Sequence, residues 1–155
     1  MKKNCFLIIV LIFLSSCGTK DDTKDMEMPT ITDTNLSVCP YDCQTFHKGD
    51  TISVIYRFND NEMLGYYNIE IHNNFNHHTH STSAKDCDLD AVKEPIKPWV
   101  YNKDFDIPRH TQSFVSNVQI AIPNNIDEGD YHFMIRLTDM AGWQQLKSVS
   151  IKIID

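Results

Sequence analysis

The chain has 155 residues, of which 41% are hydrophobic and 23% charged, and its formal net charge at pH 7 is −7. This acidic balance argues against nucleic acid as a partner, because contacts to phosphates need basic patches. The length suffices for one domain with its own hydrophobic core, and the negative charge is compatible with cation binding.

The first sixteen residues have the pattern of a targeting segment. Lys2 and Lys3 form a basic start, and residues 5–14 are an apolar run that is too short for a transmembrane helix. Leu14-Ser15-Ser16-Cys17 resembles the lipobox of bacterial lipoproteins, in which cleavage leaves the cysteine as the lipidated N-terminus. An ordinary secretory signal is the alternative. We expect residues 1–16 to be removed and acyl chains on Cys17 to anchor the protein to a membrane.

Residues 17–28 are polar and charged and show no apolar period, which predicts a flexible tether. Lys20-Asp21-Asp22 resembles the lysine-plus-acidic signal that sends Bacteroidota lipoproteins to the cell surface. We therefore expect an outer-membrane protein that faces outward, with the periplasmic face as the alternative. Loss of Lys2 and Lys3 with the signal would change the net charge from −7 to −9.

Four cysteines would remain in the mature chain, namely Cys17, Cys39, Cys43 and Cys87. A disulfide is expected outside the inner membrane, and an odd count of three thiols beside the lipidated one leaves one without an intramolecular disulfide. Spacing does not decide the pairing. A bond from Cys39 or Cys43 to Cys87 would attach the segment before the first long strand to the histidine-rich segment.

Alternation of apolar and polar residues predicts strands in residues 29–155. They are expected near residues 29–38 and at 51–58, 65–73, 99–107, 114–122, 130–138 and 146–154. No segment has a long helical period. Short strands with regularly spaced turn signals are typical of an immunoglobulin-like β-sandwich of about seven strands, and a small β-barrel is the main competitor.

Two stretches carry a family resemblance. The sequence Gly129-Asp130-Tyr131-His132-Phe133, followed by Leu137-Thr138-Asp139-Met140-Ala141-Gly142, resembles the last hairpin of many bacterial Ig-like domains. Together with Ile71-His72-Asn73-Asn74-Phe75 and His77-His78-Thr79-His80, it is similar to a family of Bacteroidota lipoproteins called domain of unknown function four-six-two-five. Where such hairpins often carry Gly-Asn, this chain has Gly142-Trp143. The resemblance implies an Ig-like fold and lipoprotein status, and no activity.

The expected sandwich places two histidines side by side. In an Ig-like sandwich the strand at 65–73 lies beside the strand at 130–138. If their middle residues Ile69 and Ile135 face each other, His72 lies opposite His132, and both side chains point away from the core. A slip of the register by two residues would break this pairing, and His72 would then be a solvated strand residue.

The same topology gathers the histidine-rich loop at one pole of the sandwich. We expect three or four residues of one set to bind a single ion, and the set is His72, His77, His78, His80 and His132. Neutral imidazoles suit zinc and copper, whereas calcium prefers six to eight oxygen ligands. Binding should weaken as the pH falls through about 6.5, because each ligand must be deprotonated. We expect this site to be open to solvent. A polar loop without metal is the alternative.

Enzyme signatures are absent from the sequence, which has no nucleophile elbow, P-loop, HExxH or dinucleotide fingerprint. We therefore expect a non-enzymatic binding module on a lipid anchor, with a transition metal as its ligand. The alternative is a protein- or glycan-binding accessory lipoprotein without metal, in which Trp99, Tyr101 and Trp143 offer an aromatic platform to a sugar.

Overall fold

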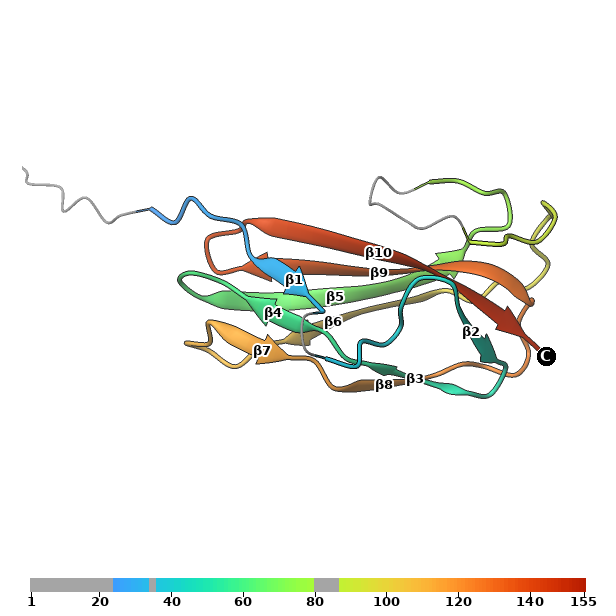
Figure 1. The fold of residues 1–155 in the computed structure, drawn as a ribbon, viewed down its shortest axis with the longest axis horizontal. Helices are drawn as coiled ribbons and strands as arrows, with labels where there is room; N and C mark the ends of the chain where they lie inside the picture. The colour runs from blue at the N-terminus through green and yellow to red at the C-terminus, as the bar shows by residue number, and fades with distance from the viewer. Residues whose placement is uncertain (1–23, 34–35, 80–86) are drawn as a thin grey trace, which may run out of the picture.

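The computed structural model describes residues 24–33, 36–79 and 87–155. These residues form ten strands and no helix, arranged as a β-sandwich (Figure 1). The strands are β1 (Thr30–Thr32), β2 (Gln44–His47), β3 (Thr51–Val54), β4 (Arg57–Asn59), β5 (Leu64–Asn73), β6 (Tyr101–Asp106), β7 (Ser113–Val115), β8 (Val118–Ala121), β9 (Gly129–Asp139) and β10 (Gln144–Ile154). Within the described ranges, no helix is long and apolar enough to span a membrane.

One layer is a five-stranded sheet in the order β2-β10-β9-β5-β6. The long strands β9 and β10 form a hairpin, and β5 pairs antiparallel with β9 on its other side. The short strand β2 pairs with the C-terminal part of β10 and is parallel to it. The predicted neighbours at 65–73, 130–138 and 146–154 therefore lie side by side.

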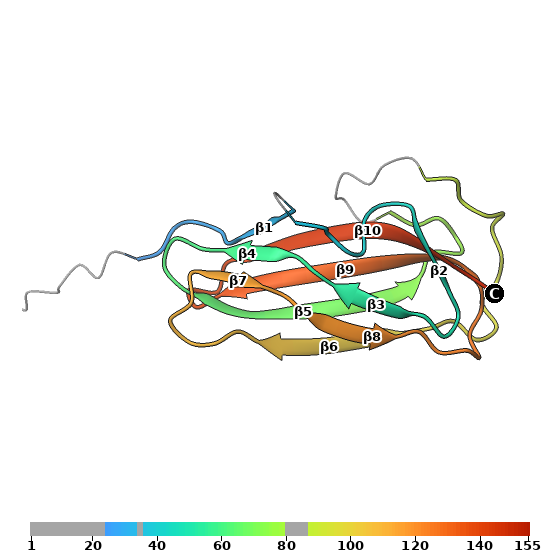
Figure 2. The same ribbon diagram turned by 60° about the horizontal axis from the view of Figure 1, so that its bottom comes forward.

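The facing layer consists of β1-β4-β7 and β3-β8, which run on from one another (Figure 2). Val54 faces Val118, and three residues further on Arg57 faces Val115, so one antiparallel register continues through both pairs. The predicted strands at 51–58 and 114–122 are each divided in two here. This division, and the presence of both β1 and β2 before β3, explains why ten strands replace the expected seven.

A buried serine causes the interruption between the two pairs. Ser116 is fully buried, and its Oγ accepts a hydrogen bond from the Tyr56 amide at 2.9 Å. The Ser116 amide donates in return to the Tyr56 carbonyl at 2.9 Å, while the Ile55 amide turns to the Cys39 carbonyl. The amides of Ile55, Tyr56 and Ser116 thus all find acceptors at the break, as buried polar groups must.

The core lies between the layers and follows the predicted alternation. Its largest fully buried side chains come from both sheets, namely Ile52, Tyr56, Phe58, Leu64, Ile69, Ile71, Tyr131, Phe133, Ile135, Leu137, Ile151 and Ile153. Phe58 of one layer and Tyr67 of the other approach with ring centroids 4.9 Å apart. Each such side chain stabilises the fold by about 1.5–3 kcal/mol through removal of apolar surface from water.

Most of the outward face of the central strand β9 is buried as well, with Arg136 as the exposed exception. Asp130, His132 and Met134 alternate with the core residues and are at most 5% exposed. The chain between β5 and β6 lies near this face: the Asp90 amide donates to Asp130 Oδ2, and the His78 carbonyl lies 3.0 Å from His132 Nε2. The edge strand β6 is different, because Asn102, Lys103, Asp104 and Asp106 are exposed.

The break in the smaller layer gives a test of stability. Ser116→Ala leaves the buried Tyr56 amide without its acceptor, and we expect the free energy of unfolding to fall by about 1–3 kcal/mol. Urea denaturation followed by circular dichroism measures it. Ser53→Ala is the matched control, since its hydroxyl bonds the side chain of Gln119 at the surface, and it should cost less than about 0.5 kcal/mol. Equal losses in the two variants would contradict this account.

Candidate functional site

The β5–β9 register carries the histidine site. Ile69 lies opposite Ile135 and His72 lies opposite His132, so the predicted register is confirmed. Both histidines are on the sheet face that points away from the core. His78, in the segment that follows β5, folds back over this face and completes a group of three imidazoles, which we call the histidine cluster.

The three rings of the histidine cluster are in mutual contact. The ring centroids of His72 and His78 are 5.4 Å apart and nearly parallel, with an interplanar angle of 13°. The His132 ring meets both edge-on, with centroids 5.5 Å from His72 and 5.0 Å from His78. The Nε2 atoms of His72 and His78 are 3.3 Å apart. Two side chains six residues apart in the sequence therefore face each other through their Nε2 atoms.

Two acceptor oxygens lie beside the far sides of these rings. Glu70 Oε1 lies 3.0 Å from His72 Nδ1, and Asn76 Oδ1 lies 2.5 Å from His78 Nδ1. The Asn76 amide oxygen can only accept, so it favours a proton on His78 Nδ1 and leaves the Nε2 of that ring to accept a proton or to bind a cation. Sequence reasoning missed Glu70 and Asn76. Glu70 is two residues before His72 on the same strand face, and this spacing could have revealed it.

The cluster is more enclosed than the sequence led us to expect. His132 is 5% exposed and the His72 side chain 18%, while His78 is half-buried. The expectation of a site open to solvent was wrong because it considered only the polar loop. His132 lies on the central strand of its sheet, where the neighbouring strands and the returning segment shield it.

The structure does not bring the whole predicted set together. His77 has a positive φ of 56°, and its Nε2 lies 2.9 Å from the Asp90 carbonyl oxygen instead of turning to the other rings. His80 lies outside the described residues, as does Cys17. The predicted ligand set therefore reduces to three described members.

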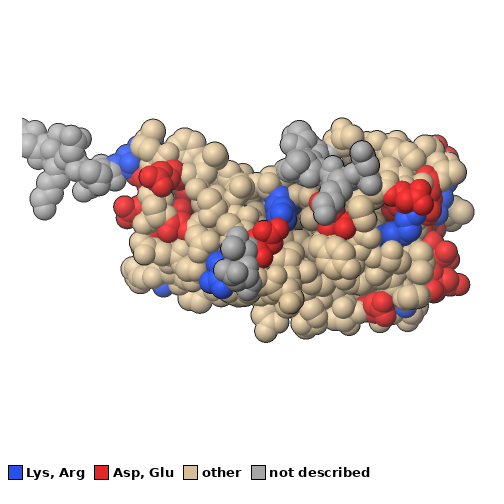
Figure 3. Space-filling view, in the orientation of Figure 1, with Lys and Arg blue, Asp and Glu red and all other residues tan. Residues whose placement is uncertain are grey.

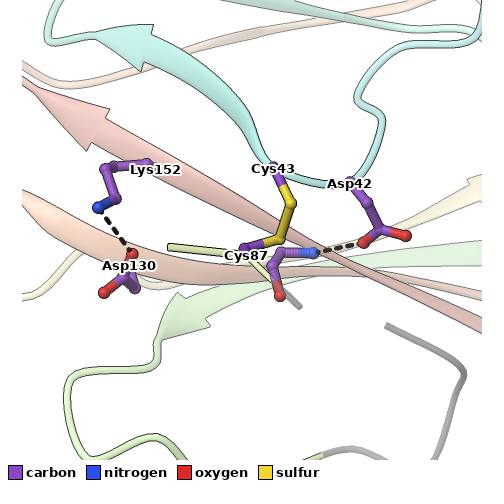
Figure 4. Close-up of a disulfide and its surroundings, with 6 residues drawn as sticks. Asp42, Cys43, Cys87, Asp130 and Lys152 are labelled. Atoms are coloured by element: carbon purple, nitrogen blue, oxygen red, sulfur yellow. Dashed lines mark hydrogen bonds and ion pairs between the residues drawn. A yellow bond between two sulfur atoms is a disulfide. The ribbon is translucent and has the colours of Figure 1, made fainter. Parts of the chain in front are cut away.

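A disulfide attaches the end of this segment to β2. Of the two pairings that the sequence left open, the structure contains Cys43–Cys87, and Cys39 is a free thiol. Burial raises the pKa of the Cys39 thiol. Figure 4 shows the disulfide over β10, with Asp42 on one side, where its Oδ1 accepts from the Ser150 amide at 3.0 Å.

An ion-pair network stands on the other side of the disulfide. Lys152 Nζ lies 2.7 Å from Asp90 Oδ1 and 3.7 Å from Asp130 Oδ1 (Figure 4 draws the second pair). The hydrogen bond to Asp90 and the nearby negative charges raise the pKa of Lys152. The Asp90 carbonyl also accepts a hydrogen bond from His77 Nε2. Through Asp90, this network therefore holds the chain at His77, next to the histidine cluster.

The aromatic platform that we considered for sugar binding is not formed. Trp99 is only 7% exposed, and its amide donates to the Tyr131 hydroxyl at 3.2 Å. Tyr101 packs against it with a centroid separation of 6.2 Å. Trp143 is half-buried in the β9–β10 turn, where its indole N–H donates to the Asp25 carbonyl at 3.0 Å.

The fold and the cluster define this chain as a β-sandwich protein with a group of imidazoles on its larger sheet. It belongs to the family described as Domain of unknown function (DUF4625), whose model matches residues 15–154. No curated protein matches the chain. Among solved structures it is similar to Spo0M, the sporulation control protein from Bacillus subtilis, with 8% identity and a TM-score of 0.42. That match covers 83% of this chain and 49% of the other, so the chain spans about half of that protein's length.

The disulfide yields a second test. We expect the double variant Cys43→Ser/Cys87→Ser to lose about 2–4 kcal/mol of unfolding free energy, because the bond closes a long loop in the unfolded chain. Urea denaturation without reductant measures the loss. Cys39→Ser leaves the bond intact and should lose less. If Cys39→Ser lost as much unfolding free energy as the double variant, loss of the Cys43–Cys87 bond would not explain the effect.

Proposed function

We propose that this protein is an outer-membrane lipoprotein, held at the cell surface by acyl chains on Cys17, and that its sandwich is a non-enzymatic binding module for zinc or copper. The support for the anchor is the sequence of residues 1–22, and the support for the metal is the histidine cluster. Residues His72, His78 and His132 would hold the ion. Proteins use neutral imidazole as a ligand for both metals.

The approach of His72 Nε2 to His78 Nε2 carries the proposal. Two nitrogens that each lie 2.0–2.1 Å from one tetrahedral zinc ion are separated by about 3.3–3.4 Å. The observed separation is 3.3 Å. The two rings are therefore already spaced as a pair of ligands to one ion would be.

The protonation pattern favours a cation between the same two atoms. Asn76 favours Nδ1–H on His78, so the Nε2 lone pair of this ring faces His72 Nε2. A proton or a metal ion between the two nitrogens makes so close an approach favourable. Outer contacts of this kind, from a carboxylate or an amide oxygen to the second ring nitrogen, accompany most histidine ligands of metal sites.

His132 supplies the third imidazole from the central strand. Its ring contacts both others, and its Nε2 donates to the His78 backbone carbonyl, which links the returning segment to β9 and leaves Nδ1 as the atom that would bind the ion. His80, from the original set, stays a predicted ligand. Three imidazoles with one further ligand satisfy the coordination number of zinc.

The metal proposal is tested by isothermal titration of the full chain in detergent with Zn(II) and with Cu(II) at pH 7.5. We expect one ion per chain. His72→Ala, His78→Ala and His132→Ala should each lower the affinity by about 10–100-fold or more, since changes in the outer shell alone cost that much.

His77→Ala is the matched control for this titration, because its ring faces the Asp90 carbonyl and not the cluster. It should bind as the unchanged protein does. Unchanged affinity in the three cluster variants, or an equal loss in His77→Ala, would end the proposal. Failure of the unchanged protein to bind either ion would favour the alternative of a protein or glycan ligand.

The anchor is tested separately by cell fractionation. Cys17→Ser removes the atom that carries the acyl chains, and we expect the variant to appear in the soluble fraction or to stay unprocessed, whereas the unchanged protein sediments with membranes. Protease digestion of intact cells then distinguishes surface display from the periplasmic face. A Cys17→Ser protein that fractionates with outer membranes as before would contradict the lipid anchor.

A further inference from the structure

A second group of ligand-type side chains lies at the opposite end of the sandwich from the histidine cluster. Asp25 precedes β1, Asp60 lies in the β4–β5 turn and Asp139 ends β9, and one ligand oxygen of each lies within 4.8 Å of the other two. Figure 1 and Figure 2 show both turns at the end where the described chain begins. Asp139 is seven residue steps along β9 from His132, a distance of about 23 Å.

Two of these carboxylates have an oxygen that protein groups do not satisfy. Asp139 is 4% exposed; its Oδ1 accepts from the Trp143 amide at 2.8 Å. Asp60 Oδ1 accepts from the amides of Glu62 and Met63. The remaining Oδ2 atoms of Asp60 and Asp139 are buried and have no hydrogen-bond partner in the described part of the chain. A buried carboxylate oxygen without a partner is costly, so each needs a positive group.

Asp25 is positioned by contacts from the other two segments. Its Oδ1 accepts from the Glu27 amide and from Asn61 Nδ2, each at 3.0 Å. Its carbonyl accepts from the Trp143 indole N–H. The hydrogen bonds from the Glu27 amide and the Asn61 side chain lower the pKa of the Asp25 carboxyl. The residues next to Asp60 and Asp139 thus hold Asp25 in place.

Within residues 24–33, 36–79 and 87–155, no lysine, arginine or histidine forms an ion pair at 4.0 Å or less with these three carboxylates. The ion pairs of these residues involve other acids, such as Asp90 and Asp130 with Lys152 or Glu128 with Lys48. Figure 3 shows acidic side chains gathered at this end of the molecule. Three carboxylates this close repel one another strongly, and a bound cation reverses the sign of the interaction.

We propose that Asp25, Asp60 and Asp139 bind a calcium ion. All three donors are oxygens, which suit a hard cation and not the metals that imidazole prefers. Oxygens that share one calcium at 2.3–2.6 Å lie at most about 4.6–5.2 Å apart, and the three oxygens here, all within 4.8 Å of one another, are close enough for this. Carboxylates that bind through both oxygens, together with water, complete a coordination number of six to eight.

Calcium at this place would attach the segment before β1 to two turns of the sandwich. Modules outside the cell bind calcium with dissociation constants of about 10⁻⁴–10⁻³ M. The site is separate from the histidine cluster in place and in chemistry, so it neither depends on the zinc or copper proposal nor supports it.

The test is thermal unfolding and isothermal titration of the full chain in detergent, freed of calcium and then supplied with about 5 mM CaCl2. We expect one calcium ion per chain and a rise in Tm of roughly 5 °C. The rise should disappear in Asp60→Asn and Asp139→Asn. Both variants keep the oxygen that accepts the backbone hydrogen bonds, and the loss of repulsion should leave their calcium-free Tm equal to or above that of the unchanged protein.

Two controls keep the result decisive. Asp104→Asn changes an exposed carboxylate of β6 outside the group and should keep the full calcium response, and so should His78→Ala. If Asp139→Asn does not fold, Asp25→Asn decides, because Asp25 lies outside the core. The proposal fails if calcium leaves the unchanged protein's Tm and titration heat unaltered, if the Asp variants respond as it does, or if magnesium at the same concentration gives an equal rise.

Discussion

The antiparallel pairing of β5 with β9 is the constraint on which the rest of the structure depends. It brings the apolar residues of both strands to the core and sets His72 beside His132 on the other face. A slip by one residue would exchange the two faces, exposing the isoleucines and burying polar side chains in their place. Both proposed ion sites use the ends of this pair, so the register determines their geometry as well as the core.

A glycine lets the same two strands come together at their far end. The register shifts between Leu64 and Tyr66, and a Cβ on Gly65 would lie 2.8 Å from the Thr138 carbonyl oxygen and 2.9 Å from that of Asp139. Any larger residue would push the β4–β5 turn away from β9. The irregularity is a local adjustment that brings Asp60 and Asp139 to one end without disturbing the pairing of His72.

The sequence predicted the parts of this fold that depend on the alternation of apolar and polar residues. Alternation identified the strands that carry Ile69, Ile135 and Ile151, and the neighbour rule for sandwiches placed them in order. It did not predict that β9 is mostly buried on both faces, because the cover comes from the segment between β5 and β6, which has no period. Nor did it predict the break at Ser116, where a side chain takes the place of a backbone acceptor.

The pairing of His72 with His132 was predicted from the register of the two strands, and the structure adds His78 to this pair. Density of histidines pointed to the segment after β5, but the positive φ of His77 turns its ring toward Asp90, and single-sequence patterns do not reveal such a turn. Glu70 and Asn76 matter only once the rings are placed, since their role is to orient them. The three aspartates are far apart in the sequence and meet only because the turns of the sandwich share an end.

The two edges of the larger sheet have a consequence for how copies of the protein behave when crowded together. The edge strand β6 has unpaired backbone groups along one side, yet it exposes Lys103, Asp104 and Asp106. At the other edge β2 has only four residues. The charged side chains of β6 and the short length of β2 both discourage another molecule from adding a strand to the sheet. In a dense layer of these sandwiches, the edges of the larger sheet would therefore not join neighbouring molecules into a continuous fibre.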